Sequence, residues 1–357
     1  MMRAPRFRYV AARSVGEAAR ALADDPGAML LAGGTDVVPG IKRRQHAPSL
    51  LVSLRRVPEL RGIRWGDDGG LELGACVTLS EIVEDGRVAQ SHAALWRAAA
   101  QVATPQIRNA GTVGGNLCLD TRCNYYDQSI EWRRAIGFCM KAPGPGGTAR
   151  TEKAGGVCWV ALSSPKCKAV SSTDLAPALI ALGARVTLAS TGGERRIPLE
   201  ELYADDGMAF TTRRHDELLT AIHVPPPAAR TRSTYWKLRR RGAFDFPVLG
   251  VAGALRVADD GTVEAARIVL GAVASKPVVV DATSLLVGGA LTDDAIDAFE
   301  EKAARFARPL DNTDFDLHWR KRVARAYLTG VLCELRGDDP ASLGLLQRRA
   351  AAMVPAG

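Results

Sequence analysis

The sequence has no apolar run of 18 residues, so no part of it predicts a membrane-spanning helix. Its first ten residues carry arginines but no apolar stretch, which excludes a secretory signal and makes the cytoplasm the expected compartment. Charge of one sign is never concentrated: of 357 residues, 47 are Lys or Arg and 39 are Asp or Glu, and the densest basic runs are only short. This scatter argues against a nucleic-acid-binding protein.

Two familiar nucleotide-binding fingerprints are also missing. The glycine loops do not read Gly-x-Gly-x-x-Gly, and no Lys-Ser or Lys-Thr pair follows them. The five histidines are scattered, and no group of acid, base and nucleophile stands out. We therefore predict no catalytic residue in this chain.

The elements that are present predict an α+β protein with a divided N-terminal region. Residues 1–56 form a short α/β unit, and residues 57–227 a larger one that carries an insertion at about 118–170. The run Pro225-Pro226-Pro227 and the residues after it predict a linker. Residues 228–340 follow as a C-terminal α+β domain, and residues 341–357 as a tail.

The C-terminal domain is expected to combine an antiparallel sheet with two helices. Strands are predicted at 235–238, 248–257, 263–270 and 278–280, because each alternates apolar and polar residues. Helices are predicted from about 293 to 308 and from about 314 to a stop at Gly337.

Two glycine loops of similar form are the first candidate site. Gly33-Gly34-Thr35-Asp36 follows the apolar run 28–32, and Thr112-Val113-Gly114-Gly115-Asn116 lies about eighty residues later. Paired glycines let the backbone present consecutive N–H groups to an anion. Each loop alone is compatible with a simple tight turn, but together they are suited to the two phosphates of one dinucleotide.

These loops carry a resemblance to a known family. The segments 30–37 and 112–116, with Phe244-Asp245-Phe246-Pro247, resemble the FAD-binding medium (β) subunit of the xanthine dehydrogenase, or molybdenum hydroxylase, family. The resemblance extends from about residue 6 to residue 335. It implies a two-part FAD-binding region with a fold like that of vanillyl-alcohol oxidase, followed by a C-terminal flavoprotein domain.

The resemblance also implies which residues contact FAD. The first loop supplies Leu30, Leu31, Ala32, Gly33, Gly34, Thr35, Asp36 and Val37, and the second supplies Thr112, Val113, Gly114, Gly115 and Asn116. Single positions that match further contacts are Val102, Asn124, Leu219 and Lys237. Lys237 has an equally plain alternative as a surface residue of a strand.

Cysteine is the unusual feature of the composition. Five of the seven cysteines fall between positions 118 and 167, although structural disulfides are not expected in a reducing compartment. The spacings after Cys123, through Cys139 and Cys158 to Cys167, do not form the paired Cys-x-x-Cys motifs of a zinc ribbon. Free buried thiols, zinc and an iron–sulfur cluster all stay open on spacing alone.

A second resemblance favours the cluster. The cysteine-rich insertion resembles that of the flavoprotein subunit in the 4-hydroxybenzoyl-CoA reductase branch of the family, which carries an additional [4Fe–4S] cluster. The implied ligands are Cys123, Cys139, Cys158 and Cys167, and the bystanders are Cys76, Cys118 and Cys333.

The implied function is electron transfer within a larger oxidoreductase. On this resemblance, electrons pass from ferredoxin or a similar low-potential donor through [4Fe–4S] and FAD to a small subunit with two [2Fe–2S] clusters. They then reach a molybdopterin-containing large subunit that dehydroxylates an aromatic acyl-CoA. The assembly is a dimer of heterotrimers. Two alternatives remain: the FAD subunit of an oxidative hydroxylase acting on an aldehyde, purine or N-heterocycle, and a non-redox dinucleotide-binding module.

Overall fold

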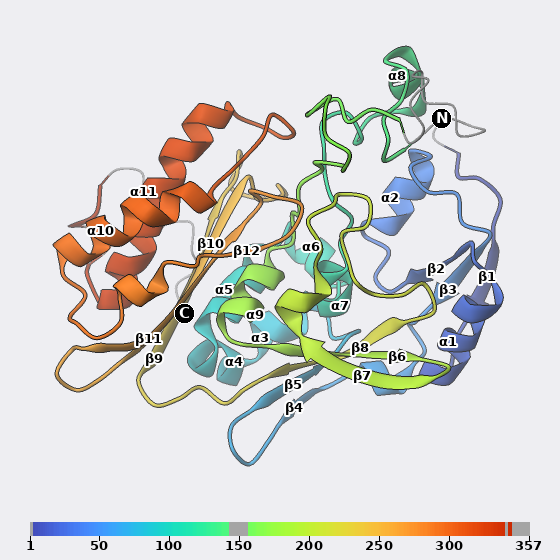
Figure 1. The fold of residues 1–357 in the computed structure, drawn as a ribbon. Helices are drawn as coiled ribbons and strands as arrows, with labels where there is room; N and C mark the ends of the chain where they lie inside the picture. The colour runs from blue at the N-terminus through green and yellow to red at the C-terminus, as the bar shows by residue number, and fades with distance from the viewer. Residues whose placement is uncertain (1–2, 143–155, 340–341, 345–357) are drawn as a thin grey trace.

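The computed structural model describes residues 3–142, 156–339 and 342–344 (Figure 1). Most of the Gly/Pro-rich stretch 141–156 and most of the predicted tail 341–357 lie outside the described residues. Helices are mixed with three separate sheets, which confirms the predicted α+β class. Within the described ranges, no helix combines the length and the apolar character needed to cross a bilayer.

The N-terminal unit is a small parallel sheet in the strand order β1-β3-β2. The Ser14 hydroxyl accepts a hydrogen bond from the Glu17 N–H, 3.1 Å away, and so caps the first helix. The first glycine loop connects β2 directly to α2. The elements are β1 (Arg8–Ala11), α1 (Val15–Asp24), β2 (Ala28–Leu31), α2 (Val37–Lys42) and β3 (Leu50–Ser53).

The second unit is built on an antiparallel sheet in the order β4-β5-β8-β6-β7. Its strands are β4 (Ile63–Trp65), β5 (Leu71–Gly74), β6 (Arg185–Ser190), β7 (Gly193–Pro198) and β8 (Leu218–Val224). Its helices are α3 (Leu79–Glu84), α4 (Gly86–Ser91), α5 (Ala93–Ala100), α6 (Pro105–Arg108), α7 (Val113–Leu117), α8 (Ile130–Ala135) and α9 (Leu175–Ala181). Short 3₁₀ turns lie at Pro58–Leu60 and Leu199–Leu202.

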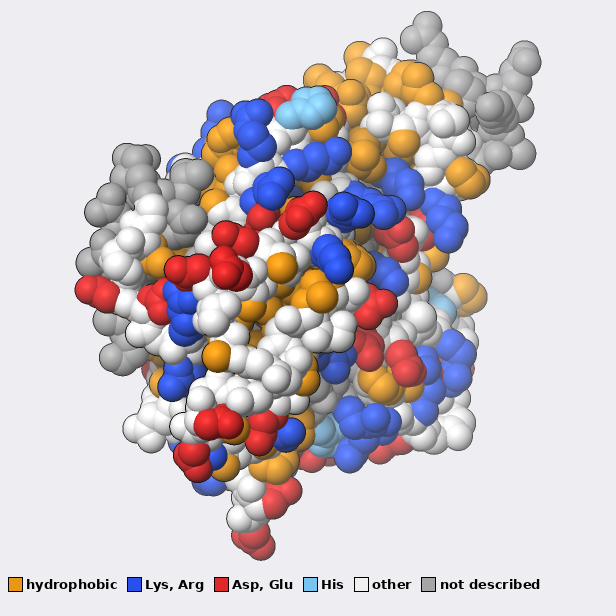
Figure 2. Space-filling model, turned by 60° about the vertical axis from the view of Figure 1, so that its left-hand side comes forward, with side chains coloured by type: hydrophobic (Ala, Val, Ile, Leu, Met, Phe, Trp, Pro, Cys, Tyr) orange, Lys and Arg blue, Asp and Glu red, His pale blue; other side chains and the backbone are white. Residues whose placement is uncertain are grey.

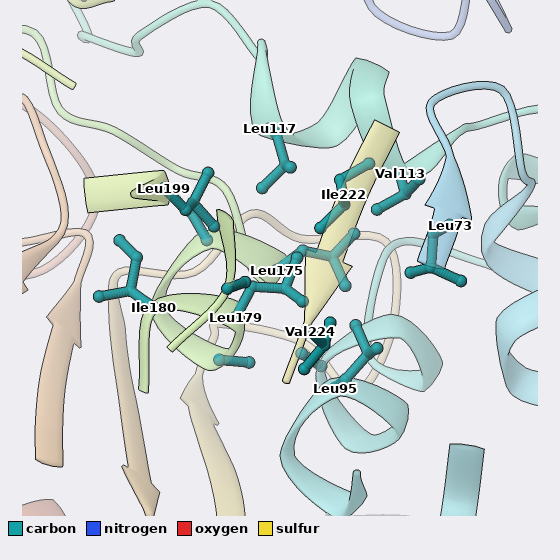
Figure 3. Close-up of a cluster of buried hydrophobic side chains, with 14 of the residues drawn as sticks. Leu73, Leu95, Val113, Leu117, Leu175, Leu179, Ile180, Leu199, Ile222 and Val224 are labelled. Carbon is teal, nitrogen blue, oxygen red and sulfur yellow. The ribbon is translucent and has the colours of Figure 1, made fainter. Parts of the chain in front are cut away.

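The main core anchors the second glycine loop. Figure 3 shows Val113 and Leu117 of α7 directed toward Leu175 of α9 and Ile222 of β8. All four side chains are buried. At about 25 cal/mol for each Å² of apolar surface removed from water, such burial is the main force that holds α7 in place.

The C-terminal domain is an antiparallel sheet in the order β12-β11-β10-β9, as predicted, covered on one side by helices (Figure 1). Gly337 adopts a left-handed φ of 111° and ends α11, also as predicted. The other side of the sheet packs on α5 and α9 of the second unit. The elements are β9 (Thr231–Leu238), β10 (Leu249–Val257), β11 (Val263–Gly271), β12 (Val278–Val279), α10 (Asp293–Ala303) and α11 (Leu317–Arg336), with short 3₁₀ turns at Thr283–Leu285 and Ala304–Phe306.

Two helix limits differ from the sequence-based expectation. The helix predicted to run to about residue 308 ends at Ala303, and the short 3₁₀ turn Ala304–Phe306 follows it. The last helix begins after Asp316, whose carboxylate caps it, so Phe315 lies outside the helix. On the face seen in Figure 2, acidic and basic side chains are interspersed, in keeping with the scatter of charge along the sequence.

Candidate functional site

The two glycine loops touch each other through backbone atoms. A β-carbon added to Gly33 would lie 1.8 Å from the carbonyl oxygen of Ala110, so only glycine fits there. A β-carbon on Gly111 would lie 3.7 Å from the Thr35 hydroxyl. Segments far apart in the sequence therefore form one continuous surface.

The first loop offers free hydrogen-bond donors. The N–H groups of Gly34, Thr35 and Asp36 donate to no acceptor in the described part of the chain. Gly34 has a positive φ of 74°, which turns the backbone between β2 and α2. Consecutive free N–H groups at such a turn form a concave site for an anion such as a phosphate.

The second loop differs from this expectation. Its N–H groups at Val113 and Gly114 donate to the carbonyls of Val77 and Ala75, both at 2.9 Å. The Gly115 N–H donates to the Thr112 hydroxyl at 3.1 Å. These donors are therefore occupied by the protein itself. A β-carbon on Gly115 would approach only that same hydroxyl, at 2.9 Å, so this loop offers space rather than donors.

Asn116 has a structural partner. Its Oδ1 accepts hydrogen bonds from the Thr173 hydroxyl at 2.7 Å and from the Leu175 N–H at 3.1 Å. The Leu175 N–H is one of the otherwise unpaired donors at the start of α9. Asn116 thus ties the second loop to the helix that packs on the C-terminal sheet.

Three cationic side chains donate hydrogen bonds to backbone carbonyls of the turn after α5. The Gln101 carbonyl accepts from Lys237 Nζ and from Arg239, each at 3.1 Å, and the Val102 carbonyl accepts from Arg108 at 2.9 Å. Phe244 donates its N–H to the Ala103 carbonyl at 3.0 Å, and its own φ is 72°. Non-glycine residues in this region of φ cost about 1–3 kcal/mol each and cluster at functional sites.

Lys237 is buried, not a surface strand residue. Its ammonium lies 2.9 Å from the Asp174 carboxylate, which also accepts a hydrogen bond from the Tyr235 hydroxyl at 2.8 Å. Burial lowers the pKa of Lys237, and the Asp174 charge opposes that shift. Burial likewise raises the pKa of Asp174, and Lys237 opposes it.

The remaining predicted contacts lie in different parts of the chain. Leu219 is buried in β8, and the carbonyl of its neighbour Thr220 accepts from the Ala75 N–H beside the second loop. Asn124 is exposed, next to Cys123, and its N–H donates to the Asn312 carbonyl at 2.9 Å. The rest of the first loop comprises Leu30 and Leu31 at the end of β2, Ala32 after it, and Val37 at the start of α2.

The four predicted cysteine ligands line one small cavity. Cys123, Cys139, Cys158 and Cys167 are each at most 7% exposed, and they enclose a volume of about 10 Å³. That is room for about one water molecule. The other three cysteines lie elsewhere: Cys76 and Cys333 are buried in other clusters, and Cys118 follows α7.

Two thiols of the cavity, those of Cys123 and Cys167, have raised pKa values because they are buried. Burial, assisted by the three neighbouring thiols and opposed by a backbone hydrogen bond, raises the pKa of Cys123 to about 12. Burial also raises the pKa of Cys167 to about 11. Among the residues that the structure describes, no three His, Cys, Asp or Glu side chains converge closely enough to hold a metal ion. Four cysteine thiolates are the usual ligands of an iron–sulfur cluster.

Three residues at these sites were missed from the sequence. Asp174 pairs with Lys237, and Arg122 forms ion pairs with Asp36 and Asp127. Arg108 supports the turn that contains Val102. The position of Arg122 directly before Cys123 was the available signal, but its partner in the first loop is distant in the sequence.

Comparison with known proteins gives two family matches. The FAD binding domain in molybdopterin dehydrogenase matches residues 5–227, and the CO dehydrogenase flavoprotein C-terminal domain matches residues 233–335. The aldehyde oxidoreductase FAD-binding subunit PaoB of Escherichia coli (strain K12) is 30% identical over 342 residues, which cover 93% of this chain and 99% of that protein.

Two further similarities extend the comparison. The xanthine dehydrogenase FAD-binding subunit of Escherichia coli O157:H7 is 28% identical over 271 residues, covering 76% of this chain and 75% of that one. A chain from the structure of carbon monoxide dehydrogenase from Hydrogenophaga pseudoflava is 26% identical, with a TM-score of 0.73 over 99% of this chain and 100% of that one.

Proposed function

Because this chain belongs to the FAD-binding subunits of the molybdopterin dehydrogenase family, we propose that it is the flavin-carrying subunit of an oxidative molybdenum hydroxylase. The observation that carries the proposal is the backbone contact between Gly33 and Ala110, inside the matched FAD-binding region. It brings the free N–H groups of the first loop against the turn that leads into α7, the helix in which Gly115 is exposed. One surface then offers both anion-binding donors and room for a close approach.

The residues of the chain have separate parts in this proposal. Gly34, Thr35 and Asp36 bind phosphate through their N–H groups, and Gly115 leaves space for the cofactor. The turn at Val102, supported by Arg108, Arg239 and Lys237, orients the flavin ring. Bound FAD can accept two electrons and release them singly, so it links a two-electron reaction to one-electron carriers.

The partners follow from the same proposal. The substrate is oxidised on a molybdopterin-containing large subunit, and electrons reach FAD through a small subunit with two [2Fe–2S] clusters. The names of the relatives favour this direction, because they are an aldehyde oxidoreductase and dehydrogenases. We propose an aldehyde or an N-heterocycle as the substrate class.

The cysteine cavity supports a further cofactor and a second candidate function. We propose that Cys123, Cys139, Cys158 and Cys167 hold a [4Fe–4S] cluster, since all four line one cavity. Binding requires the cavity to expand and the thiols to lose their protons. A subunit with this cluster also suits a 4-hydroxybenzoyl-CoA reductase-like enzyme, supplied with electrons by ferredoxin.

One experiment separates the two functions. The purified complex is analysed for FAD, iron, sulfide and molybdenum, and flavin absorbance is then followed on anaerobic mixing with an aldehyde, an N-heterocycle or 4-hydroxybenzoyl-CoA. Bleaching of the flavin by an aldehyde or an N-heterocycle supports the oxidative hydroxylase. Reoxidation of a reduced flavin by 4-hydroxybenzoyl-CoA, without bleaching by the other two, supports the reductase and rejects the oxidative proposal.

A further inference from the structure

Arg122 joins the first glycine loop to the cysteine segment, which is the described part of the insertion at about 118–170. Its guanidinium forms an ion pair with Asp36 in that loop and another, at 3.4 Å, with Asp127 in the cysteine segment. It also lies 4.4 Å above the centre of the Phe246 ring, and its side chain is 11% exposed. Asp36 is the N-cap residue of α2, but its carboxylate accepts no hydrogen bond from the N–H groups of that helix. The carboxylate pairs with Arg122 instead.

Other contacts hold the same two segments together. Gln45, just after α2, donates to the Tyr126 carbonyl at 2.9 Å and to the Asp127 carboxylate at 3.1 Å. Arg133 of α8 donates to the Arg43 carbonyl at 2.8 Å. In Figure 1, α8 lies above α2, in agreement with these contacts. The helix that follows the first loop is thus fixed against the cysteine segment.

Arg122 is also fixed to the wall of the cysteine cavity. Its backbone exchanges two hydrogen bonds with Val170, at 2.8 and 2.7 Å, and the next residue is Cys123, which lines the cavity. Cys167, which also lines the cavity, lies three residues before Val170 in an irregular stretch of chain. A displacement of Arg122 therefore moves two sides of the cavity wall.

We propose that Arg122 is a positioning residue that couples FAD binding at the first loop to the ordering of the wall of the four-cysteine cavity. The inference rests on the proposed function, because it takes FAD as the ligand of that loop. The carboxylate of Asp36 lies in a loop suited to phosphate, and like charges would repel. Arg122 neutralises that carboxylate, so a phosphate-bound loop requires Arg122, and with it Cys123, in the observed place. Such coupling is reciprocal: an ordered cavity wall must raise FAD affinity by the same factor.

The test measures the cavity thiols rather than enzyme activity. The full chain, freed of flavin and iron, is alkylated with iodoacetamide with and without saturating FAD, and modification of Cys123 and Cys139 is followed by peptide mass spectrometry. We expect FAD to slow alkylation by about fivefold or more in the wild type, the usual lower range of allosteric coupling. In Arg122→Gln, saturating FAD should leave the rates unchanged.

Two further variants make the test specific. Arg122→Lys keeps the positive charge next to Asp36 but lacks the second guanidinium nitrogen that reaches Asp127. This variant should therefore bind FAD, but FAD should no longer protect its thiols from alkylation. Arg134→Gln, an exposed arginine on α8, is the matched control and should behave as wild type. If Arg122→Gln does not fold, Arg122→Lys alone decides the result.

Each outcome has a distinct meaning. Thiol protection by FAD that persists in both Arg122 variants would overturn the coupling but leave the flavin function intact. The same holds if FAD binds the wild type without slowing alkylation. A wild-type chain that binds no FAD would instead overturn the proposed function, and the coupling with it.

Discussion

Gly33 and Ala110 are in such close backbone contact that the Gly33 α-carbon leaves no room for a β-carbon on the side of the Ala110 carbonyl. This contact places the end of β2 against the turn before α7, in two units that are otherwise built on different sheets. The candidate flavin site depends on it, because the free donors belong to one unit and the open glycine face to the other.

Gly33→Ala should separate the two loops. The added methyl overlaps backbone atoms that cannot rotate away, so the loops must move apart, and FAD affinity should fall by about tenfold or more, equivalent to about 1.4 kcal/mol. Titration of flavin fluorescence measures the dissociation constant. Gly86→Ala is the matched control, because a β-carbon there meets no atom within 4 Å. Equal affinities in the two variants would show that the contact does not shape the site.

Cys139→Ser should lower the iron content without removing FAD. The replacement deletes one proposed thiolate ligand in the cavity, while the glycine loops are untouched. Iron and flavin are measured on the same purified sample. Cys333→Ser, at a buried cysteine of the C-terminal core, should keep both cofactors. Full iron retention in Cys139→Ser would refute the ligand assignment.

Lys237→Met should destabilise the protein strongly. The side chains of Lys237 and Asp174 are 0% and 3% exposed, so the substitution leaves a buried carboxylate without its cation. Loss of one partner of a buried pair costs about 3–5 kcal/mol in the free energy of unfolding. Urea denaturation measures the loss. The double variant Lys237→Met, Asp174→Asn should recover part of it, and a double variant no more stable than the single one would contradict the pairing.

Stability should fall as the pH drops below the ordinary histidine pKa. His92 is 1% exposed, and burial, assisted by the charge of Arg87, lowers its pKa from 6.5, although the Pro225 carbonyl opposes the shift. The unfolded chain therefore binds a proton at a pH where the folded chain does not. The resulting stability is present above 6.5 and is lost as the pH falls through the lowered value.

Urea midpoints at about pH 7.5 and about pH 5.5 measure this effect. The difference between them should shrink in His92→Gln. The exposed His318→Gln serves as the control and should keep the wild-type difference. An unchanged difference in His92→Gln would assign the acid sensitivity to other groups.

Much of the architecture was predictable because it depends on local patterns. The alternating residues of β10 and β11, and the glycine that ends α11, specify their own conformations. The arrangement of the second loop was not predictable, because its N–H groups are taken by carbonyls of Ala75 and Val77, residues on a different segment. A local sequence pattern does not show which distant carbonyl will accept a hydrogen bond from a given backbone N–H.

The same limit applies to charged side chains. Lys237 is compatible with a surface strand until Asp174 is seen to lie beside it in the interior. Arg122 and Asp36 lie on separate units, and only the packing of α2 against the cysteine segment makes them neighbours. Ion pairs of this kind depend on tertiary structure. The cysteine spacing has the same limit, because on its own it is compatible with free thiols, zinc or a cluster.

The most direct test of the central claim is the number of FAD molecules bound per chain in the purified protein, measured by absorbance and by release of the flavin on denaturation. We predict one FAD per chain, with a flavin band at about 450 nm. In Gly115→Val we predict that the bound FAD is lost, because the larger side chain fills the open face of the second loop. A colourless wild-type chain that takes up no added FAD, or a Gly115→Val variant with full flavin content, would contradict the account.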